Sequence, residues 1–280
     1  MGVRVVTDSA CDLPPELCDE QGIEVVPLTV RFGDEELVDR VELSNVDFWK
    51  RMETSTVLPE TSAPSVGVFE ETFRRIAAEG ADGIVCISLS SRLSATMQSA
   101  QVASKALEGL CPIAVIDSCS ASMGTGSHAL HAARLAADGA DLTTIVEAIE
   151  DRRSRQHLFG ALDTLEYLRR GGRIGGAQAM FGSMLSIKPI ITVIDGAVAP
   201  AGKVRTRSKA LRFLIDQVKE SNVEELCVLH SQAPDIDLFL EMLEPVVPDG
   251  EIIVGEIGPV IGVHAGPRVV GVTWIARRTS

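Results

Sequence analysis

Hydroxyl side chains are concentrated in one short segment, Ser88-Leu89-Ser90-Ser91-Arg92-Leu93-Ser94-Ala95-Thr96, in which five of nine residues are Ser or Thr. The segment follows an apolar run at 83–89, typical of a buried strand, and leads into a helical pattern at 94–107. Hydroxyls and free backbone N–H groups at the start of a helix can bind a carboxylate or a phosphate. Helix capping, the alternative, needs only one or two hydroxyls. The segment therefore predicts an anion site at the carboxyl end of a strand.

A second hydroxyl-rich segment, Thr61-Ser62-Ala63-Pro64-Ser65, precedes a helical pattern at 65–78. Ser or Thr followed by Pro is common at helix starts, so this segment alone predicts little. If both segments meet in the fold, their hydroxyls can converge on one anion.

A third segment, Gly124-Thr125-Gly126-Ser127-His128-Ala129, has the glycine spacing of dinucleotide-binding loops. The preceding strand is expected to end near Asp117, so six residues intervene before Gly124. No acidic residue ends a second strand at the distance that a ribose ligand requires. We therefore expect no cofactor here, and glycines that let a helix pack closely on the sheet.

Two kinds of catalytic site are alternatives to simple binding. The sequence has no G-x-S-x-G elbow, but a serine hydrolase with Ser94 or Ser91 as nucleophile and His264 as base remains an alternative. His128 and His131 are three apart on a predicted helix without a further ligand at matching spacing. We expect them on the helix surface, and we expect no metal site.

Composition restricts the possible partners. Hydrophobic residues make up 45% of the chain and charged residues 23%, which is typical of a globular protein. The formal net charge of −13 argues against nucleic acid, which needs concentrated positive charge. No apolar run of about 18 residues is present to span a bilayer, and no signal peptide is visible. We expect a cytoplasmic protein without an integral membrane segment.

The cysteines show no pattern typical of zinc sites or disulfide frameworks. None stands in a C-x-x-C pair, and Cys86 and Cys227 lie inside apolar, strand-like runs. We expect reduced and mostly buried thiols. The six cysteines are Cys11, Cys18, Cys86, Cys111, Cys119 and Cys227.

The first half of the chain alternates apolar strands with amphipathic helices. Strands are expected at 3–7, 23–26, 83–89 and 113–116, with a hairpin over 28–38 and helices at 65–78, 94–107 and between 120 and 157. Strands that are apolar at every position are typical of a parallel sheet covered on both faces. This pattern predicts a three-layer α/β/α domain over residues 1–157.

The second half has adjacent strands with short connections. Strands are expected at 158–162, 225–230, 252–256, 260–264 and 269–275, with a hairpin over 190–204 and helices at 164–169 and 208–219. This pattern predicts a two-layer α/β domain with a mixed sheet over residues 158–280, its helices on one face. No internal repeat or low-complexity linker is visible, so we expect the two domains to share a substantial interface.

Taken in order, several motifs resemble those of the DegV family of bacterial fatty acid-binding proteins. They are Val5-Val6-Thr7-Asp8-Ser9, the two hydroxyl-rich segments, Ile116-Asp117-Ser118, Leu165-Glu166-Tyr167-Leu168-Arg169-Arg170-Gly171-Gly172-Arg173-Ile174, Ile187-Lys188-Pro189-Ile190 and Gly262-Val263-His264-Ala265-Gly266-Pro267. The resemblance covers nearly the whole chain. It implies that a long-chain fatty acid such as palmitate or oleate is buried near the domain junction, without a cofactor.

The resemblance also implies roles for individual residues. Thr61 and Ser94 are expected to bind the fatty acid carboxylate. The residues expected near the head group are Ser62, Ser91, Ala95, Thr96, Arg173 and His264. The residues expected to line the acyl chain are Met97, Met180, Phe181, Met184, Leu185 and Ile187. For any one lining residue, an ordinary core position is the alternative.

Some members of the family carry the acyl chain for a fatty acid kinase, whose ATP-dependent subunit phosphorylates the bound carboxylate. The resemblance therefore implies a kinase subunit as a partner and a role in lipid metabolism, with no enzymatic activity in this chain itself. Arg173, Arg205 and Arg207 are the expected partner surface. Three positions depart from the family pattern: Ala63, Ala95 and Arg268.

Overall fold

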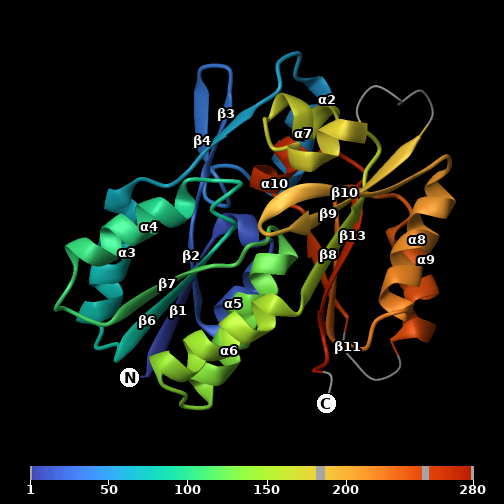
Figure 1. The fold of residues 1–280 in the computed structure, drawn as a ribbon. Coiled ribbons are helices and arrows are strands. Elements are labelled where there is room, and N and C mark those ends of the chain that lie inside the picture. The colour runs from blue at the N-terminus through green and yellow to red at the C-terminus, as the bar shows by residue number, and fades with distance from the viewer. Residues whose placement is uncertain (1, 181–186, 248–251, 279–280) are drawn as a thin grey trace.

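The computed structural model describes residues 2–180, 187–247 and 252–278. It contains a parallel sheet in the first half of the chain, a mixed sheet in the second half, and a small antiparallel sheet above them (Figure 1). Helix α5 lies between the two larger sheets and contacts strands of both. The α/β fold expected from the sequence is therefore confirmed.

The first half builds a parallel sheet in the order β2-β1-β6-β7. Neighbouring residues of β1 face opposite layers, since Val5 packs in the core with α5 and α6 whereas Val6 packs with α3 and α4. The sheet is thus covered on both faces, as predicted. The elements are β1 (Val3–Asp8), α1 (Pro15–Gln21), β2 (Ile23–Val26), α3 (Val66–Ala78), β6 (Gly83–Ser88), α4 (Thr96–Ala106), β7 (Ile113–Asp117), α5 (Met123–Ala137) and α6 (Leu142–Ser154).

The second half builds a mixed sheet in the order β10-β9-β8-β13-β11-β12, in which β11 and β12 pair in parallel and the other neighbours pair antiparallel. Helices α8 and α9 cover one face. The opposite face packs against the first half, where Ile191 and Leu229 share a core with Met123 of α5. The elements are β8 (Gln156–Ala161), β9 (Lys188–Ile194), β10 (Ala197–Val204), α8 (Arg207–Lys219), β11 (Val223–His230), α9 (Ile236–Leu243), β12 (Ile253–Glu256) and β13 (Val270–Ala276).

The antiparallel sheet and three helices form what we call the cap. Its elements are β3 (Thr29–Phe32), β4 (Glu35–Val38), α2 (Asn45–Thr54), β5 (Glu60–Ser62), α7 (Glu166–Arg170) and α10 (Pro259–Ala265). Helix α2 packs directly on α10 at Gly262, where an added Cβ would lie 2.6 Å from Phe48. Short 3-10 turns occur at η1 (Ser9–Cys11), η2 (Gly175–Met180) and η3 (Glu244–Val246).

One predicted strand is wrong, because residues 260–264 lie in helix α10. Gly258 is the N-cap residue of this helix and Pro259 occupies its first turn, a position in which proline favours helix initiation. A five-residue apolar run has no periodicity that distinguishes strand from helix. The error matters for function, since His264 lies on this helix.

The expected surface location of the two α5 histidines is also wrong. His128 is fully buried, and His131 is partly buried. Burial lowers the pKa of His128 to about 3 and that of His131 to about 4, and the nearby Arg152 adds to both shifts. The reason is tertiary, because α5 is packed between two sheets and exposes little of its circumference.

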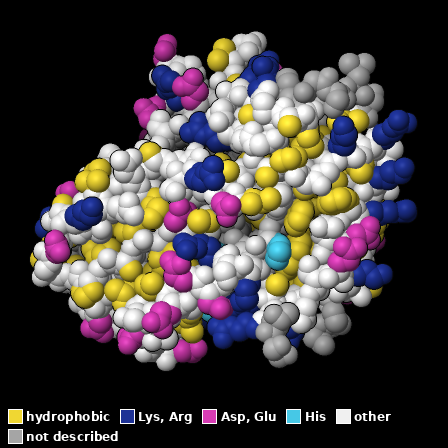
Figure 2. Space-filling model, viewed as in Figure 1, with side chains coloured by type: hydrophobic (Ala, Val, Ile, Leu, Met, Phe, Trp, Pro, Cys, Tyr) yellow, Lys and Arg dark blue, Asp and Glu magenta, His cyan; other side chains and the backbone are white. Residues whose placement is uncertain are grey.

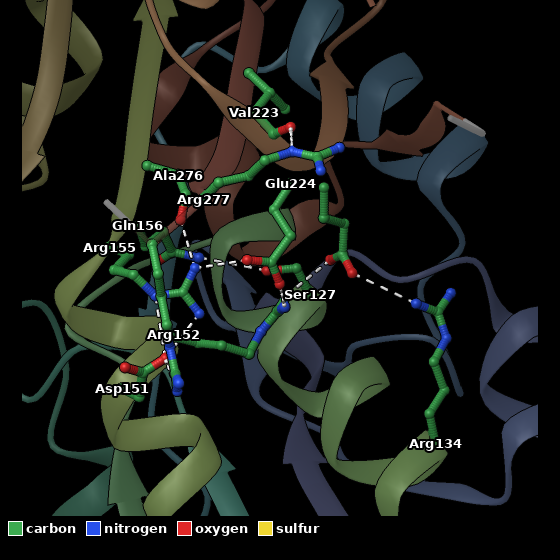
Figure 3. A network of polar contacts seen from close by, with 12 residues as sticks. Ser127, Arg134, Asp151, Arg152, Arg155, Gln156, Val223, Glu224, Ala276 and Arg277 are labelled. Carbon is green, nitrogen blue, oxygen red and sulfur yellow. Dashed lines mark hydrogen bonds and ion pairs between the residues drawn. The ribbon is translucent and has the colours of Figure 1, made fainter. Parts of the chain in front are cut away.

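A network of ion pairs joins the two halves where α6 meets β11 (Figure 3). Arg152 is 2% exposed and pairs with Glu224 at 3.5 Å and Glu225 at 3.0 Å. Arg155 pairs with Glu224 at 2.7 Å, and Arg134 of α5 reaches Glu225 at 3.4 Å. Buried charge at this edge is therefore compensated across the interface between the halves.

Over the described ranges, no helix is both long and apolar enough to cross a membrane. The same residues contain no His, Cys, Asp and Glu cluster suited to a metal ion. All six cysteines are free thiols, and Cys119 is the one that is partly exposed.

Candidate functional site

An apolar cavity lies where the two large sheets meet the cap. Its walls come from the carboxyl-end loops of the parallel sheet, from β8, β9 and β10, and from α10. Its volume is about 210 Å³, many times the space that a single buried water needs. The polar side chains among its lining residues are Thr61, Ser94, Ser122, Arg173 and His264. An apolar cavity with a few convergent polar groups is the usual form of a small-molecule site.

Thr61 and His264 contact each other in the wall of the cavity. Thr61 Oγ1, on the cap strand β5, lies 3.0 Å from Nε2 of His264 on α10. The other ring nitrogen of His264, Nδ1, is buried and has no hydrogen-bond partner among the described residues. A buried N–H without an acceptor is costlier than an unpaired acceptor. We therefore assign the proton to Nε2, which donates to Thr61 and leaves the Thr61 hydroxyl hydrogen available to a ligand.

The charge state of His264 suits that assignment. Burial lowers its pKa to about 4, and the positive charge of Arg173 adds to the shift. The imidazole is therefore neutral near pH 7. Arg173 then provides the positive charge among the polar lining residues, next to neutral hydrogen-bond donors.

Arg173 is held in place by two backbone carbonyls. Its Nε donates to Leu93 O at 3.0 Å, and one Nη donates to Gly171 O at 2.7 Å. These bonds tie the guanidinium to the loop that carries Ser94 and to the end of α7. Arg173 is thus partly buried beside the cavity, and its remaining N–H groups can meet an anion.

Ser94 lies at the amino end of α4, in the loop that was predicted to bind an anion. Its Oγ accepts from the backbone N–H of Thr96 at 3.3 Å and lies 2.8 Å from the Thr96 hydroxyl. Ala95, the N-cap residue, makes no side-chain cap. The amino end of α4, where the helix dipole is positive, therefore adjoins the cavity at Ser94 and Ala95, which are both lining residues.

The other hydroxyls of this loop serve the structure. Ser88 donates to Asp8 at 3.0 Å, and Ser91 donates to Asp117 at 2.5 Å on the exposed side of the loop. Ser90 donates to Gly196 O at 2.7 Å, which fixes the tip of the β9–β10 hairpin on the first half. The hydroxyls of this segment thus serve contacts with neighbouring segments of the fold as much as they line the cavity.

The structure brings some of the expected site residues together and leaves others outside. Thr61, Ser94, Ala95, Arg173 and His264 line the cavity, as does Ala63. Ser62 and Ser91 are exposed, and Thr96 is buried behind Ser94. None of the three is among the lining residues.

The residues expected along the acyl chain lie elsewhere or are not described. Met97, Met180 and Ile187 are partly buried and are not among the lining residues. The positions of Phe181, Met184 and Leu185 lie outside the described residues. Aliphatic residues of the strands line the cavity instead, including Leu158, Ile191, Val198 and Leu229. The sequence could not predict which aliphatic residues line the cavity, because this depends on how the second sheet faces the first.

Sequence reasoning missed Ser122 and its partner Asp12. Ser122 lines the cavity and donates to Asp12 at 2.5 Å, and Asp12 also accepts from the backbone N–H of Gly258 at 2.9 Å. Burial raises the pKa of Asp12 to about 7 despite these bonds. Asp12 and Ser122 both have positive φ, a backbone conformation that the sequence did not indicate. Asp12 thereby links Ser122 in the cavity wall to Gly258, the N-cap residue of α10.

Two glycines let α7 approach α10 closely. A Cβ at Gly171 would lie 2.1 Å from Nδ1 of His264, and a Cβ at Gly266 would lie 2.3 Å from the Tyr167 ring. The position of the imidazole therefore depends on the absence of a side chain at residue 171.

The groups of a serine hydrolase are not aligned in this arrangement. The described contact of the His264 ring is with Thr61, while Ser94 contacts Thr96 and Ser91 contacts Asp117. A nucleophile needs its base within hydrogen-bonding reach and a third group that orients the base. His264 Nδ1, where such a group would bind, has no partner among the described residues.

Comparison with known proteins gives a consistent result. Residues 2–277 match a family model described as an uncharacterised protein, DegV family. A DegV domain-containing protein of Streptomyces coelicolor is 40% identical over 281 residues, covering 98% of this chain and 99% of the relative.

Solved structures align over nearly the whole chain. A fatty acid-binding DegV family protein from Thermus thermophilus aligns with a TM-score of 0.91 and 32% identity, covering 99% of this chain and 100% of that one. A stearic acid-binding protein from Eubacterium ventriosum aligns with a TM-score of 0.90 and 26% identity, covering 98% of each chain. These likenesses extend over both halves and the cap.

Proposed function

The chain belongs to the DegV family, and on this basis we propose that it binds one long-chain fatty acid, such as palmitate or oleate, in the cavity between its two halves. The observation that carries the proposal is an apolar cavity with donors gathered in one part of its wall. The structures that align with it include proteins described as binding fatty acids, stearic acid among them.

In this proposal the carboxylate lies between the Thr61 hydroxyl, Ser94 and the amino end of α4. Both hydroxyls are available as donors, Thr61 because His264 donates to it. Arg173 provides the countercharge, and hydrogen bonds to a charged group are the stronger kind. The acyl chain then extends among the aliphatic residues of β8, β9 and β10. Burial of its methylenes contributes roughly 0.8 kcal/mol each before ordering costs.

Mass spectrometry of the purified protein tests the binding proposal. Denatured protein should release a long-chain fatty acid, and delipidated protein should bind added palmitate or oleate with a stoichiometry of one. Absence of both would contradict it. Turnover of an acyl ester by the pure protein would instead support the hydrolase alternative.

We also propose that the bound carboxylate is presented to the ATP-dependent subunit of a fatty acid kinase, for use in lipid metabolism. Of the three arginines expected at the partner surface, Arg207 is paired with Asp235 at 2.8 Å and Arg173 is held by two carbonyls. Arg205 is exposed. It belongs to a group of exposed cations on the end of β10 and on α8, where Lys and Arg side chains gather at the edge of the view in Figure 2. That group is Lys203, Arg205, Lys209 and Arg212.

Acyl phosphate formation with a matching kinase subunit tests this second step. We expect Arg205→Ala to bind fatty acid normally and to support less acyl phosphate formation, because an arginine can bind phosphate oxygens in pairs. Arg207→Ala, whose side chain is already paired, is the comparison variant. Full activity of Arg205→Ala would place the presentation surface elsewhere.

A further inference from the structure

One polar side chain of the cavity wall, Ser122, does not belong to the proposed head-group site. Among the described residues that line the cavity, that site takes up the other polar side chains, those of Thr61, Ser94, Arg173 and His264. The remaining lining residues are aliphatic or glycine. An acyl chain that extends from the head-group site therefore runs along an aliphatic wall that contains a hydroxyl.

The backbone of Ser122 has a conformation that favours glycine. Its φ is 53° and its ψ is −142°, a region that glycine adopts readily and that strains residues with a side chain. Ser122 is also only 2% exposed, so its hydroxyl lies in the interior and not in a solvated turn. Backbone strain of this kind persists where the side chain has a role.

The hydrogen bonds of Ser122 leave its oxygen available as an acceptor. A serine hydroxyl has one hydrogen to donate and two lone pairs that can accept. The hydrogen is donated to Asp12 at 2.5 Å, and Ser122, the N-cap residue of α5, makes no side-chain cap to that helix. Asp12 is itself held by the backbone N–H of Gly258 at 2.9 Å, which fixes the direction of the Ser122 hydroxyl. A donor in the cavity can therefore bond to an oxygen that is already oriented.

The position of Ser122 relative to helix α10 separates it from the head-group site. Asp12 links Ser122 to Gly258 at the start of α10, whereas His264 lies in the last turn of that helix. The two ends are about 9 Å apart, at a rise of 1.5 Å per residue. An extended chain advances roughly 1.2 Å per bond, as the polypeptide backbone does, so about eight bonds span this distance. Ser122 therefore lies beside the middle of a long acyl chain.

We propose that the cavity prefers a long-chain fatty acid with a hydroxyl group near the middle of its chain, whose O–H donates to the Ser122 oxygen. This inference rests on the proposed function and names the class of fatty acid that the site takes. A hydroxyl buried among aliphatic side chains without a partner weakens binding, because it loses its hydrogen bonds to water. Ser122 supplies a partner at the one point where the hydroxyl of such a chain arrives.

Isothermal titration of delipidated protein with stearate and 10-hydroxystearate tests the proposal. We expect 10-hydroxystearate to bind at least as tightly as stearate, whereas a hydroxyl left without a partner would weaken binding about tenfold. Weaker binding of 10-hydroxystearate than of stearate would overturn the proposal and leave fatty acid binding itself intact. Failure of both acids to bind would contradict the proposed function, and this inference with it.

Ser122→Gly tests the role of the hydroxyl, because glycine adopts this backbone conformation without strain. The dissociation constant of 10-hydroxystearate, divided by that of stearate, should rise at least about fivefold over the parent's ratio. Ser120→Ala is the matched control and should keep the parent's ratio, since Ser120 is 2% exposed in the same loop and does not line the cavity. A smaller rise for Ser122→Gly, or an equal rise for Ser120→Ala, would overturn the assignment. If Ser122→Gly fails to fold, the titration of the parent decides the point.

Discussion

Thr61 Oγ1 lies 3.0 Å from Nε2 of His264, although the two residues are 203 positions apart in the chain. The contact forms because the cap carries β5 across α10. The contact orients the Thr61 hydroxyl. Because the neutral imidazole donates from Nε2 to the Thr61 oxygen, the hydroxyl hydrogen points away from His264. His264 can thereby orient a donor toward the cavity without carrying charge itself.

Thr61→Val tests this donor with almost no change in shape. We expect fatty acid affinity to fall by about tenfold to a hundredfold, because a hydrogen bond to a charged group contributes roughly 1.5–3 kcal/mol. Isothermal titration with palmitate measures the change. Ser62→Ala is the matched control, since Ser62 lies on the same strand, is exposed and does not line the cavity. Equal affinities of Thr61→Val and the parent would show that the carboxylate is bound elsewhere.

Ser94→Ala should weaken fatty acid binding to a similar degree, because it removes the cavity-lining hydroxyl at the amino end of α4. Ser91→Ala should bind like the parent, since Ser91 donates to Asp117 outside the cavity. The same titration applied to both variants separates the two roles. Weaker binding by Ser91→Ala alone would move the head group to the exposed side of the loop.

The sequence predicted the two α/β halves because strand and helix periodicities are local properties. Largely apolar runs such as 83–89 indicated the parallel sheet, and the hairpin expected over 190–204 forms as β9 and β10. The cap was only partly predicted. The hairpin over 28–38 forms as expected, but β5, three residues long, lies in a segment whose pattern is typical of a helix start, and no pattern predicts α2.

Site residues that lie in sequence motifs were predictable, whereas those that only tertiary packing brings to the cavity were not. Thr61, Ser94, Arg173 and His264 come from four distant segments and meet in one cavity. Ser122 could not be found in this way, because its place depends on an unusual backbone conformation and on its buried partner Asp12. Met97, Met180 and Ile187 are not among the lining residues, because which strand face meets the cavity depends on the packing of two sheets.

Asp12→Asn should change how stability depends on pH. Burial raises the pKa of Asp12 to about 7, so between about pH 4 and pH 7 the folded chain binds more protons than the unfolded one. The contribution of Asp12 to stability is therefore full below that window and is lost as pH rises through it. Asn does not titrate but keeps an oxygen for the Gly258 N–H.

The free energy of unfolding of Asp12→Asn, relative to the parent, should thus increase from pH 4 to pH 7 and level off above it. The increase should reach several kcal/mol, since one pKa unit corresponds to about 1.4 kcal/mol. Asp8, whose pKa burial raises to about 6, is common to both proteins and cancels. Urea unfolding at four pH values measures the difference, and a difference independent of pH would be contrary to this account.

Arg152→Met should destabilise the chain by roughly 3 kcal/mol, the lower end of the range for a broken buried pair, because it removes the shorter ion pair of Glu225 and leaves the contact with Arg134 at 3.4 Å. The Glu225 side chain is only 16% exposed, so water compensates it poorly. Arg278→Met is the control, since that side chain is 73% exposed in its pair with Asp151 and should contribute about 1 kcal/mol or less. Similar midpoints for the two variants in denaturant would mean that the network adds little.

Gly171→Ala should reduce fatty acid affinity by about tenfold to a hundredfold, the effect expected from losing one charged hydrogen bond. The backbone at residue 171 has a φ of −74°, which alanine adopts readily, so the chain itself is not strained. The added Cβ would instead lie 2.1 Å from Nδ1 of His264 and force the imidazole away from Thr61. Thr61 then loses the partner that orients its hydroxyl.

Gly172→Ala provides the opposite case. Its φ of 70° strains any other residue, but nothing lies within 4 Å of the added Cβ. It should lower the unfolding free energy by about 1 kcal/mol and leave affinity unchanged. Titration and thermal unfolding of both variants therefore distinguish a glycine that makes room for a side chain from one that permits a turn. If Gly171→Ala bound palmitate like the parent, His264 would have no part in orienting Thr61, because its imidazole cannot keep its place beside a Cβ at residue 171.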